Sequence, residues 1–151
     1  MIKEATALEG FIGSFSRDKE IPVGFSWGYR IPLSRTQSVN FPLVRSLLEK
    51  KEINPGSTFY NAETGVIEKY QGKGIGSLLV LDMVFEAARK SYKFFTFRTI
   101  NPQMKKIVTN LFSKNQPTKL FQDPENKSPW FCWDFKDFDY LNAKHKIKRE
   151  K

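Results

Sequence analysis

The sequence predicts an α/β domain with a mixed, mostly antiparallel sheet flanked by helices. Three observations indicate this class. The chain has 151 residues, which suits one domain with a core of its own. Aromatic and β-branched runs that follow one another across polar turns are typical of antiparallel hairpins. Near the middle, a strand-like run, a helical run and a second strand-like run succeed one another, which is the pattern of a crossover between parallel strands.

The first elements are two strands followed by an excursion. Residues 8–16 (LEGFIGSFS) and 21–31 (IPVGFSWGYRI) are aromatic and β-branched, and a polar segment separates them, so we predict a hairpin. Residues 32–56 then leave the sheet. Within them, residues 42–50 (PLVRSLLEK) have helical spacing and begin with a proline, which suits the first turn of a helix.

A crossover occupies the middle of the chain. Residues 57–67 (STFYNAETGVI) are the predicted third strand, in which the isolated Gly65 indicates a bulge or the close approach of another backbone or a ligand. Residues 77–90 (SLLVLDMVFEAARK) carry an apolar stripe at helical spacing and form the strongest predicted helix. Residues 93–100 (KFFTFRTI) follow as a strand whose composition predicts burial.

The last part of the chain adds one helix and two strands. Asn101 and Pro102 are a good N-cap and a good first residue for a helix that runs to about residue 113. Residues 120–121 and 130–135 (WFCWDF) are the candidate final strands. The predicted order is therefore strand, strand, helix, strand, loop, helix, strand, helix, strand, strand.

Net charge and composition limit the classes of binding partner and the cellular compartment that we expect. The net charge is +9, which favours anionic partners such as a phosphorylated cofactor, nucleic acid or a membrane surface. Residues 143–151 are strongly basic, so we predict a single domain over residues 1–142 and a solvated basic C-terminal tail. Cys132 is the one cysteine, which rules out an internal disulfide, and we predict it to be a core residue. No run resembles a signal peptide or a membrane span, so we expect a cytoplasmic protein with no membrane partner.

The segment Gly72-Lys73-Gly74-Ile75-Gly76 lies between a predicted strand and the start of the strongest helix. The first N–H groups of a helix lack internal partners, and the helix dipole places partial positive charge there. Glycine lets the backbone turn sharply and approach an anion closely, and Lys73 adds a full positive charge. A tight turn without a ligand would explain one glycine but not three with a lysine. We therefore predict that this segment binds a phosphate or pyrophosphate.

Two common phosphate-binding motifs do not fit this segment. In a Walker A loop, Ser or Thr follows the lysine and binds Mg²⁺, but here Gly74 follows Lys73. A dinucleotide-binding fingerprint needs a third glycine where Ser77 stands, and an acidic residue on the next strand, which residues 93–100 lack.

The pattern that remains is Gln/Arg-x-x-Gly-x-Gly/Ala, which Gln71, Gly74 and Gly76 match. Residues 59–76 (FYNAETGVIEKYQGKGIG) closely resemble the central motif of the GNAT N-acetyltransferase superfamily, and the resemblance covers residues 57–115 well. The predicted hairpin also looks like that family's second and third strands. The resemblance implies a GNAT-like acyl-CoA N-acyltransferase fold with a V-shaped sheet, and it implies acetyl-CoA (coenzyme A) as the cofactor.

The resemblance also implies a set of cofactor-binding residues. In such proteins the backbone of the loop binds the coenzyme A pyrophosphate. The pantetheine arm pairs with the end of the preceding strand, which splays from its parallel neighbour, and Gly65 would be a bulge there. An asparagine at the start of the last helix commonly contacts the same arm. The implied residues are Val66, Ile67, Gln71, Gly72, Lys73, Gly74, Ile75, Gly76 and Asn101.

The implied reaction is acetyl transfer to a primary amine of a small molecule or a polypeptide, with an oxyanion near a backbone N–H of the strand. A primary amine with a pKa of about 10.4 is protonated at neutral pH, so a proton acceptor is useful. Glu63 stands where family members often carry a suitable glutamate and is the candidate general base. Alternatively, it is a surface carboxylate, or one that only attracts the cationic acceptor.

The sequence departs from the family pattern in two respects. Val108 stands where many relatives carry a tyrosine that protonates the leaving thiolate, and the spacing aims no other tyrosine at the sulfur. Fewer than ten residues precede the hairpin, so we expect an N-terminally shortened fold without the helices that usually wall the acceptor site. That wall would then be formed by residues 32–56 or by a second subunit in a homodimer, or it would be absent.

Two other functions remain open at this point. A non-catalytic acyl-CoA-binding or regulatory domain would explain Val108 and the short N-terminal region. A nucleic-acid-binding module would use the basic tail and the aromatic residues, but no motif beyond charge supports nucleic acid as a partner. No cluster of residues has the spacing of metal ligands, so we expect no metal site.

Overall fold

The computed structural model describes residues 9–99, 102–112, 117, 119–139 and 141. They form a six-stranded sheet in the order β1-β2-β3-β4-β6-β5, in which β3 and β4 are the parallel pair and the other neighbours are antiparallel. The predicted class, a mixed and mostly antiparallel sheet flanked by helices, is confirmed. The strands are β1 (Ile12–Asp18), β2 (Ile21–Arg30), β3 (Thr58–Val66), β4 (Phe94–Arg98), β5 (Lys119–Gln122) and β6 (Pro129–Asp134).

In the described residues three α-helices alternate with the strands in the predicted order: α2 (Phe41–Lys50), α3 (Ile75–Arg89) and α4 (Pro102–Thr109). The predicted start of α2 is confirmed to within one residue. The side chain of Asn40 accepts a hydrogen bond from the backbone N–H of Leu43, and Pro42 occupies the first turn. No helix in the described part of the chain is long and apolar enough to cross a membrane.

Two predicted boundaries shift for local reasons. Arg17 and Asp18, predicted to lie in the first turn, continue β1, because the chain reverses at Lys19 with a φ of 58°. The last helix ends at Thr109 instead of near residue 113. Asn101 and the predicted tail lie outside the described residues, so the division at residue 142 stays a prediction.

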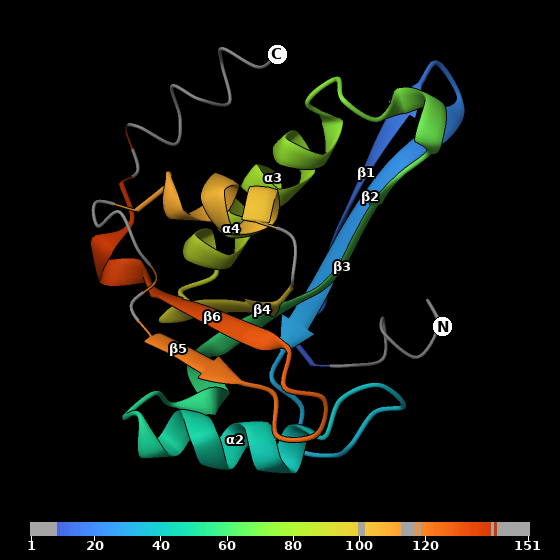
Figure 1. Cartoon of the computed structure of the whole chain (residues 1–151). Helices are drawn as coiled ribbons and strands as arrows, with labels where there is room; N and C mark the ends of the chain where they lie inside the picture. Colours follow the sequence, from blue (N-terminus) through green and yellow to red (C-terminus); the bar gives the residue numbers. More distant parts are fainter. Residues whose placement is uncertain (1–8, 100–101, 113–116, 118, 140, 142–151) are drawn as a thin grey trace.

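Hydrophobic clusters lie on both faces of the sheet, because side chains along a strand alternate between its faces. Along β6, Trp133 packs in the cluster that includes α3 and α4, whereas Trp130 and Cys132 pack in the cluster that includes α2. Figure 1 shows α3 and α4 on one side of the sheet and α2 on the other. The prediction that Cys132 is a core residue is confirmed, since its side chain is fully buried.

The sheet opens between β3 and β4. Their parallel pairing covers only the start of β3, from Thr58 to Tyr60. Figure 1 shows β1, β2 and β3 rising together as one arm, while β4, β6 and β5 continue across the molecule. The V-shaped sheet implied by the resemblance is therefore present, and the second half of β3 forms one inner edge of the V.

A bulge in β3 lies where this opening begins. Asn61 and Glu63 pair with consecutive residues of β2, so Ala62 between them is the extra residue. The sequence predicts the bulge at Gly65 instead, and that prediction is wrong, because Gly65 pairs in regular register with Phe25. A Cβ at Gly65 would lie 2.6 Å from the ring of Phe25. The glycine therefore makes room for a close aromatic ring, a reason that the sequence did not indicate for it.

Candidate functional site

A cavity of about 430 Å³ opens where β3 ends, beside the first turns of α3 and α4. We call it the β3–α3 cleft. Its lining includes many of the residues predicted to bind the cofactor, namely Val66, Gln71, Gly72, Gly74, Ile75 and Gly76. The other lining residues are Thr64, Gly65, Tyr70, Ser77, Gln103, Met104 and Ile107. The glycine-rich loop and the open edge of β3 thus face one space.

Two glycines of the loop adopt a left-handed backbone conformation. Gly72 has a φ of 77° and Gly74 a φ of 85°, a region that residues with a Cβ rarely adopt. A Cβ at either position would meet no atom within 4 Å, so the backbone angle, and not crowding, requires glycine here. A Cβ at Gly76 would lie 3.7 Å from the side chain of Val66, an ordinary contact, which explains why alanine also fits the sequence pattern there.

The N-terminus of α3 faces the β3–α3 cleft without a side-chain cap. Gly74 is the N-cap residue and offers no side-chain acceptor. The first backbone bond of the helix joins the N–H of Leu78 to the carbonyl of Gly74. The N–H groups of Ile75, Gly76 and Ser77 precede that bond, at the positive end of a helix of 15 residues. This arrangement fits a phosphate group.

Side chains tie the loop to the sheet. The Nε2 of Gln71 donates a hydrogen bond of 3.0 Å to the carbonyl of Val66 at the end of β3. The hydroxyl of Tyr70 donates a hydrogen bond of 2.5 Å to the carboxylate of Asp18 on β1, and this bond raises the pKa of Tyr70. The Nζ of Lys73 lies 5.4 Å from the centre of the Tyr70 ring. These hydrogen bonds hold the loop to the end of β3 and to the hairpin of β1 and β2.

The backbone of β3 presents polar groups to the opening of the V. The N–H of Ile67 donates to the carbonyl of Val23 on β2, and in an antiparallel pair the residues that bond to the neighbour alternate with those that face away. The backbone groups of Thr64 and Val66 therefore point away from β2, toward the side that β4 has left. The bond from Gln71 to the carbonyl of Val66 agrees with this direction. Another extended chain can pair with this edge.

Glu63 lies on the face of β3 opposite the side chain of Thr64, because neighbouring residues of a strand alternate. It pairs with Trp27 and is exposed to solvent. Burial raises the pKa of the nearby Tyr29, and the negative charge of Glu63 raises it further. The side chain of Glu63 is therefore on the side of the sheet that α2 covers in part, and the glycine-rich loop is on the other side.

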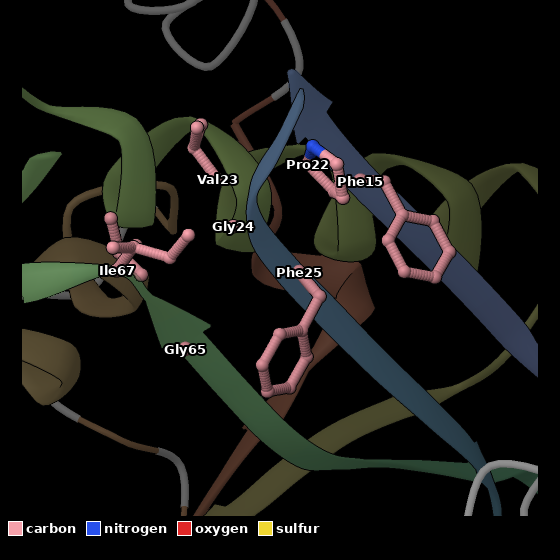
Figure 2. A pocket seen from close by; sticks show the side chains of 8 residues that line it. Phe15, Pro22, Val23, Gly24, Phe25, Gly65 and Ile67 are labelled. Carbon is pink, nitrogen blue, oxygen red and sulfur yellow. The ribbon is translucent and has the colours of Figure 1, made fainter. Parts of the chain in front are cut away.

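A second hollow of about 360 Å³ lies on the face of the sheet that carries Trp27 and Glu63, and it shares Gly65 and Val66 with the β3–α3 cleft. Figure 2 shows the side chains that line it, among them Phe25 and Ile67 near Gly65, and Phe15 on the neighbouring strand. The side chain of Ile67 thus faces this second hollow, and the N–H of Ile67 is bonded to β2. Phe15, with 56% exposure, makes the rim of this hollow apolar.

A buried charged network that the sequence did not predict joins the end of β4 to β6 and to the loop between β5 and β6. Asp123 is only 4% exposed and accepts hydrogen bonds from Arg98 at 2.9 Å and from the indole N–H of Trp130 at 3.0 Å. The backbone N–H groups of Glu125 and Asn126 bond to its other carboxylate oxygen. Burial acts to raise the pKa of Asp123, but these hydrogen bonds outweigh it and lower the pKa below its usual value.

Val108, Tyr60 and Tyr92 lie outside the β3–α3 cleft, whereas Tyr70 lines it and donates its hydroxyl proton to Asp18. Val108 is fully buried in the core against α3. Tyr60 is buried in the cluster with α2, and this burial raises its pKa well above the ordinary value. Tyr92 donates its hydroxyl proton to the carbonyl of Gly10. None of these three residues lines the β3–α3 cleft.

Comparisons with known proteins identify the fold. No protein-family model matches the sequence, and a search of curated proteins finds no match. Among solved structures, the chain is similar to an uncharacterized protein from Bacillus halodurans, with a TM-score of 0.64 and 10% identity over 99% of this chain and 72% of the other.

Two similar structures are acetyltransferases. An aminoglycoside 6'-acetyltransferase type Ii gives a TM-score of 0.54 with 13% identity over 88% of this chain and 74% of the other. The PaiA N-acetyltransferase from Thermoplasma acidophilum, solved in complex with coenzyme A, gives 0.53 with 10% identity over 88% of this chain. The match spans 65% of the length of that protein. These similarities establish the predicted GNAT-like acyltransferase fold for the described residues.

Proposed function

We propose that this chain, which has the fold of the GNAT acetyltransferases, moves an acetyl group from acetyl-CoA to a primary amine of a small molecule or a polypeptide. One observation carries the proposal. An uncapped helix N-terminus, two left-handed glycines and an open strand edge line one cavity of about 430 Å³. An anion-binding helix end beside a pairing strand edge suits a cofactor that combines a pyrophosphate with an amide-containing arm.

The residues of the β3–α3 cleft fit coenzyme A in two parts. The N–H groups of Ile75, Gly76 and Ser77 would hold the pyrophosphate, with Lys73 as a nearby positive charge. The edge of β3 at Thr64 and Val66 would pair with the pantetheine arm. Acetyl-CoA, when bound, supplies an activated acetyl group as a thioester. We keep Asn101 as a proposed further contact, although it lies outside the described residues.

The acceptor amine would approach from the other face of β3. Glu63 is exposed there, and a carboxylate attracts an ammonium group and can take its proton. Helix α2, which belongs to the excursion of residues 32–56, packs on this face of the sheet. It is therefore the proposed wall of the acceptor site, in place of the homodimer that the sequence left open.

We expect Glu63→Gln to lower the rate of amine acetylation about a hundredfold at neutral pH, because positioned general bases contribute roughly 10²–10⁴-fold. The affinity for acetyl-CoA should stay unchanged, since Glu63 and the loop lie on different sides of the sheet. Thiol release measured across a panel of primary amines tests the rate, and calorimetry tests the affinity. Glu68→Gln, the same change at an exposed residue beside the loop, is the matched control and should retain full activity.

Equal rates for Glu63→Gln and the wild type would remove the base role from Glu63.

One observation favours a second function, a non-catalytic acyl-CoA-binding or regulatory domain: Val108 is buried in the core where relatives carry a catalytic tyrosine. In that case the wild type would bind acetyl-CoA but release no thiol with any amine of the panel. Binding and thiol release measured on the same sample distinguish the two functions.

A further inference from the structure

Three polar side chains form a closed cluster beneath the open part of the sheet. Ser26 on β2 lies 2.7 Å from the hydroxyl of Thr64 and donates to the side-chain carbonyl of Asn61 at 3.2 Å. The Nδ2 of Asn61 donates to the hydroxyl oxygen of Thr64, also at 3.2 Å. Ser26 is fully buried and Asn61 is 5% exposed, whereas Thr64 lines the β3–α3 cleft. We call these residues the Ser26–Asn61–Thr64 cluster.

The hydroxyl protons of the cluster have two arrangements. A hydroxyl group has one proton to donate and two lone pairs that accept. In the first arrangement, Thr64 donates to Ser26, and Ser26 donates to Asn61. In the second, Ser26 donates to Thr64, and the proton of Thr64 turns toward the cleft; Asn61 then loses the hydrogen bond from Ser26, a loss that a bond from Thr64 to a ligand must outweigh. The oxygen of Thr64 accepts from Asn61 in both, so it stays in place while its proton is redirected.

The position of Thr64 singles it out among the hydroxyl groups of the cleft. Tyr70 and Ser77, the other hydroxyl residues that line it, belong to the loop and to the first turn of α3. Thr64 alone of the three lies on β3, at the inner edge of the V. The backbone N–H of Thr64 points into the opening, as the alternation along β3 requires.

The leaving thiolate needs a hydrogen-bond donor at the inner edge of β3. The position that carries a tyrosine in the related sequences is Val108, which is buried in the core. Tyr60 is buried on the far face, and its burial raises its pKa well above the ordinary value, so it is a weak acid. A thiolate that develops in a site sheltered from water is stabilised by a fixed donor aimed at it.

We propose that the hydroxyl of Thr64, held in place by Asn61 and Ser26, donates a hydrogen bond to the sulfur of coenzyme A and stabilises it as the leaving thiolate. This proposal rests on the proposed function. As the amine nitrogen bonds to the acetyl carbon, the bond from that carbon to sulfur breaks and its electron pair moves to the sulfur. Thr64 keeps its proton, because an aliphatic alcohol is a much weaker acid than a thiol. Glu63 takes the first proton from the ammonium group before the attack and releases it to solvent. After the attack the nitrogen loses a second proton to solvent, and the thiolate takes up one proton from solvent and leaves as the thiol.

The test measures the acidity of the coenzyme A thiol while it is bound to the protein. The rate at which iodoacetamide alkylates bound coenzyme A, followed by mass as a function of pH, gives the pKa of that thiol. We expect Thr64→Val to raise this pKa by about one unit, since one hydrogen bond contributes about 1 kcal/mol and one pKa unit is about 1.4 kcal/mol. Thr64→Ser, which keeps the hydroxyl, should restore the wild-type value.

Two controls separate a donor from a merely structural role. Ser16→Ala removes a hydroxyl on β1 of the same sheet, outside the cleft, and should leave the thiol pKa unchanged. Ser26→Ala removes the internal acceptor for the proton of Thr64, so that proton is free to point into the cleft and the thiol pKa should fall below the wild-type value. A purely structural cluster predicts that Ser26→Ala raises the pKa as much as Thr64→Val does, and that result would overturn the proposal.

The binding of coenzyme A to each variant is measured first, by calorimetry. A wild type that binds no coenzyme A defeats the proposed function, and this proposal with it. Binding with the same thiol pKa in the wild type and in Thr64→Val defeats only the role of Thr64. Should Thr64→Val not fold, a thiol pKa in Ser26→Ala that falls below the wild-type value supports the donor role, and an unchanged or raised pKa overturns it.

Discussion

Replacing Gly74 with aspartate should lower the affinity for coenzyme A at least about a hundredfold, a change of about 2.7 kcal/mol. Gly74 is the N-cap of α3 and adopts a φ of 85°, and aspartate is one of the few residues that tolerate this conformation. A carboxylate there accepts from the free N–H groups of the helix and repels the pyrophosphate. Two unit charges about 4 Å apart near a protein surface repel by roughly 4 kcal/mol, which salt reduces.

Gly74→Asn is the matched control, because it has the same shape and the same tolerance of the left-handed region without the charge. It should bind coenzyme A clearly more tightly than Gly74→Asp, and the gap should narrow as salt is added. Calorimetric titration of both purified variants measures this difference. Equal affinities for the two variants would mean that no phosphate lies at the N-terminus of α3.

Asp123→Ala should lower the free energy of unfolding by about 3–5 kcal/mol, the usual cost of removing one partner of a buried ion pair. The carboxylate of Asp123 is 4% exposed, and the guanidinium of Arg98 is 18% exposed. Removing the carboxylate leaves Arg98 and the indole N–H of the fully buried Trp130 without their acceptor. Urea denaturation of the variant and the wild type measures the loss.

Glu125→Ala is the control for this change. The side chain of Glu125 is 45% exposed and forms an ion pair with Arg35. Exposed ion pairs contribute little to stability, so Glu125→Ala should leave the urea midpoint nearly unchanged.

The loss of stability in Asp123→Ala should also depend on pH. The pKa of Asp123 is lowered in the folded state from its ordinary 3.8, so its contribution is present above that value and disappears as pH falls through the lower folded-state pKa. A deficit that persists unchanged in strong acid would contradict the ion-pair explanation.

The sequence predicted the elements whose signals are local. Pro42 marked the start of α2, and the apolar stripe after Gly76 marked α3, because a proline in the first turn and helical periodicity depend on residues a few positions apart. The glycine-rich loop was predicted for the same reason, since left-handed angles at Gly72 and Gly74 leave a direct trace in the residue type.

Features that depend on pairing across the sheet were not predictable in this way. The bulge lies at Ala62 and not at Gly65, because the register between β2 and β3 decides its place. Asp123 meets Arg98 from 25 positions away, and Ser26 meets Thr64 across two strands. Such partners are set by the tertiary fold, and the residue types alone carry no sign of them.

The most direct test of the cofactor site is the thermal unfolding of the wild-type protein at increasing concentrations of acetyl-CoA. A ligand that binds only the folded state at one hundred times its dissociation constant adds about 2.7 kcal/mol of stability. We predict a melting temperature that rises with acetyl-CoA and keeps rising with the logarithm of its concentration, while Gly74→Asp shows little change. A melting temperature of the wild type that stays constant up to millimolar acetyl-CoA would contradict coenzyme A binding in the β3–α3 cleft.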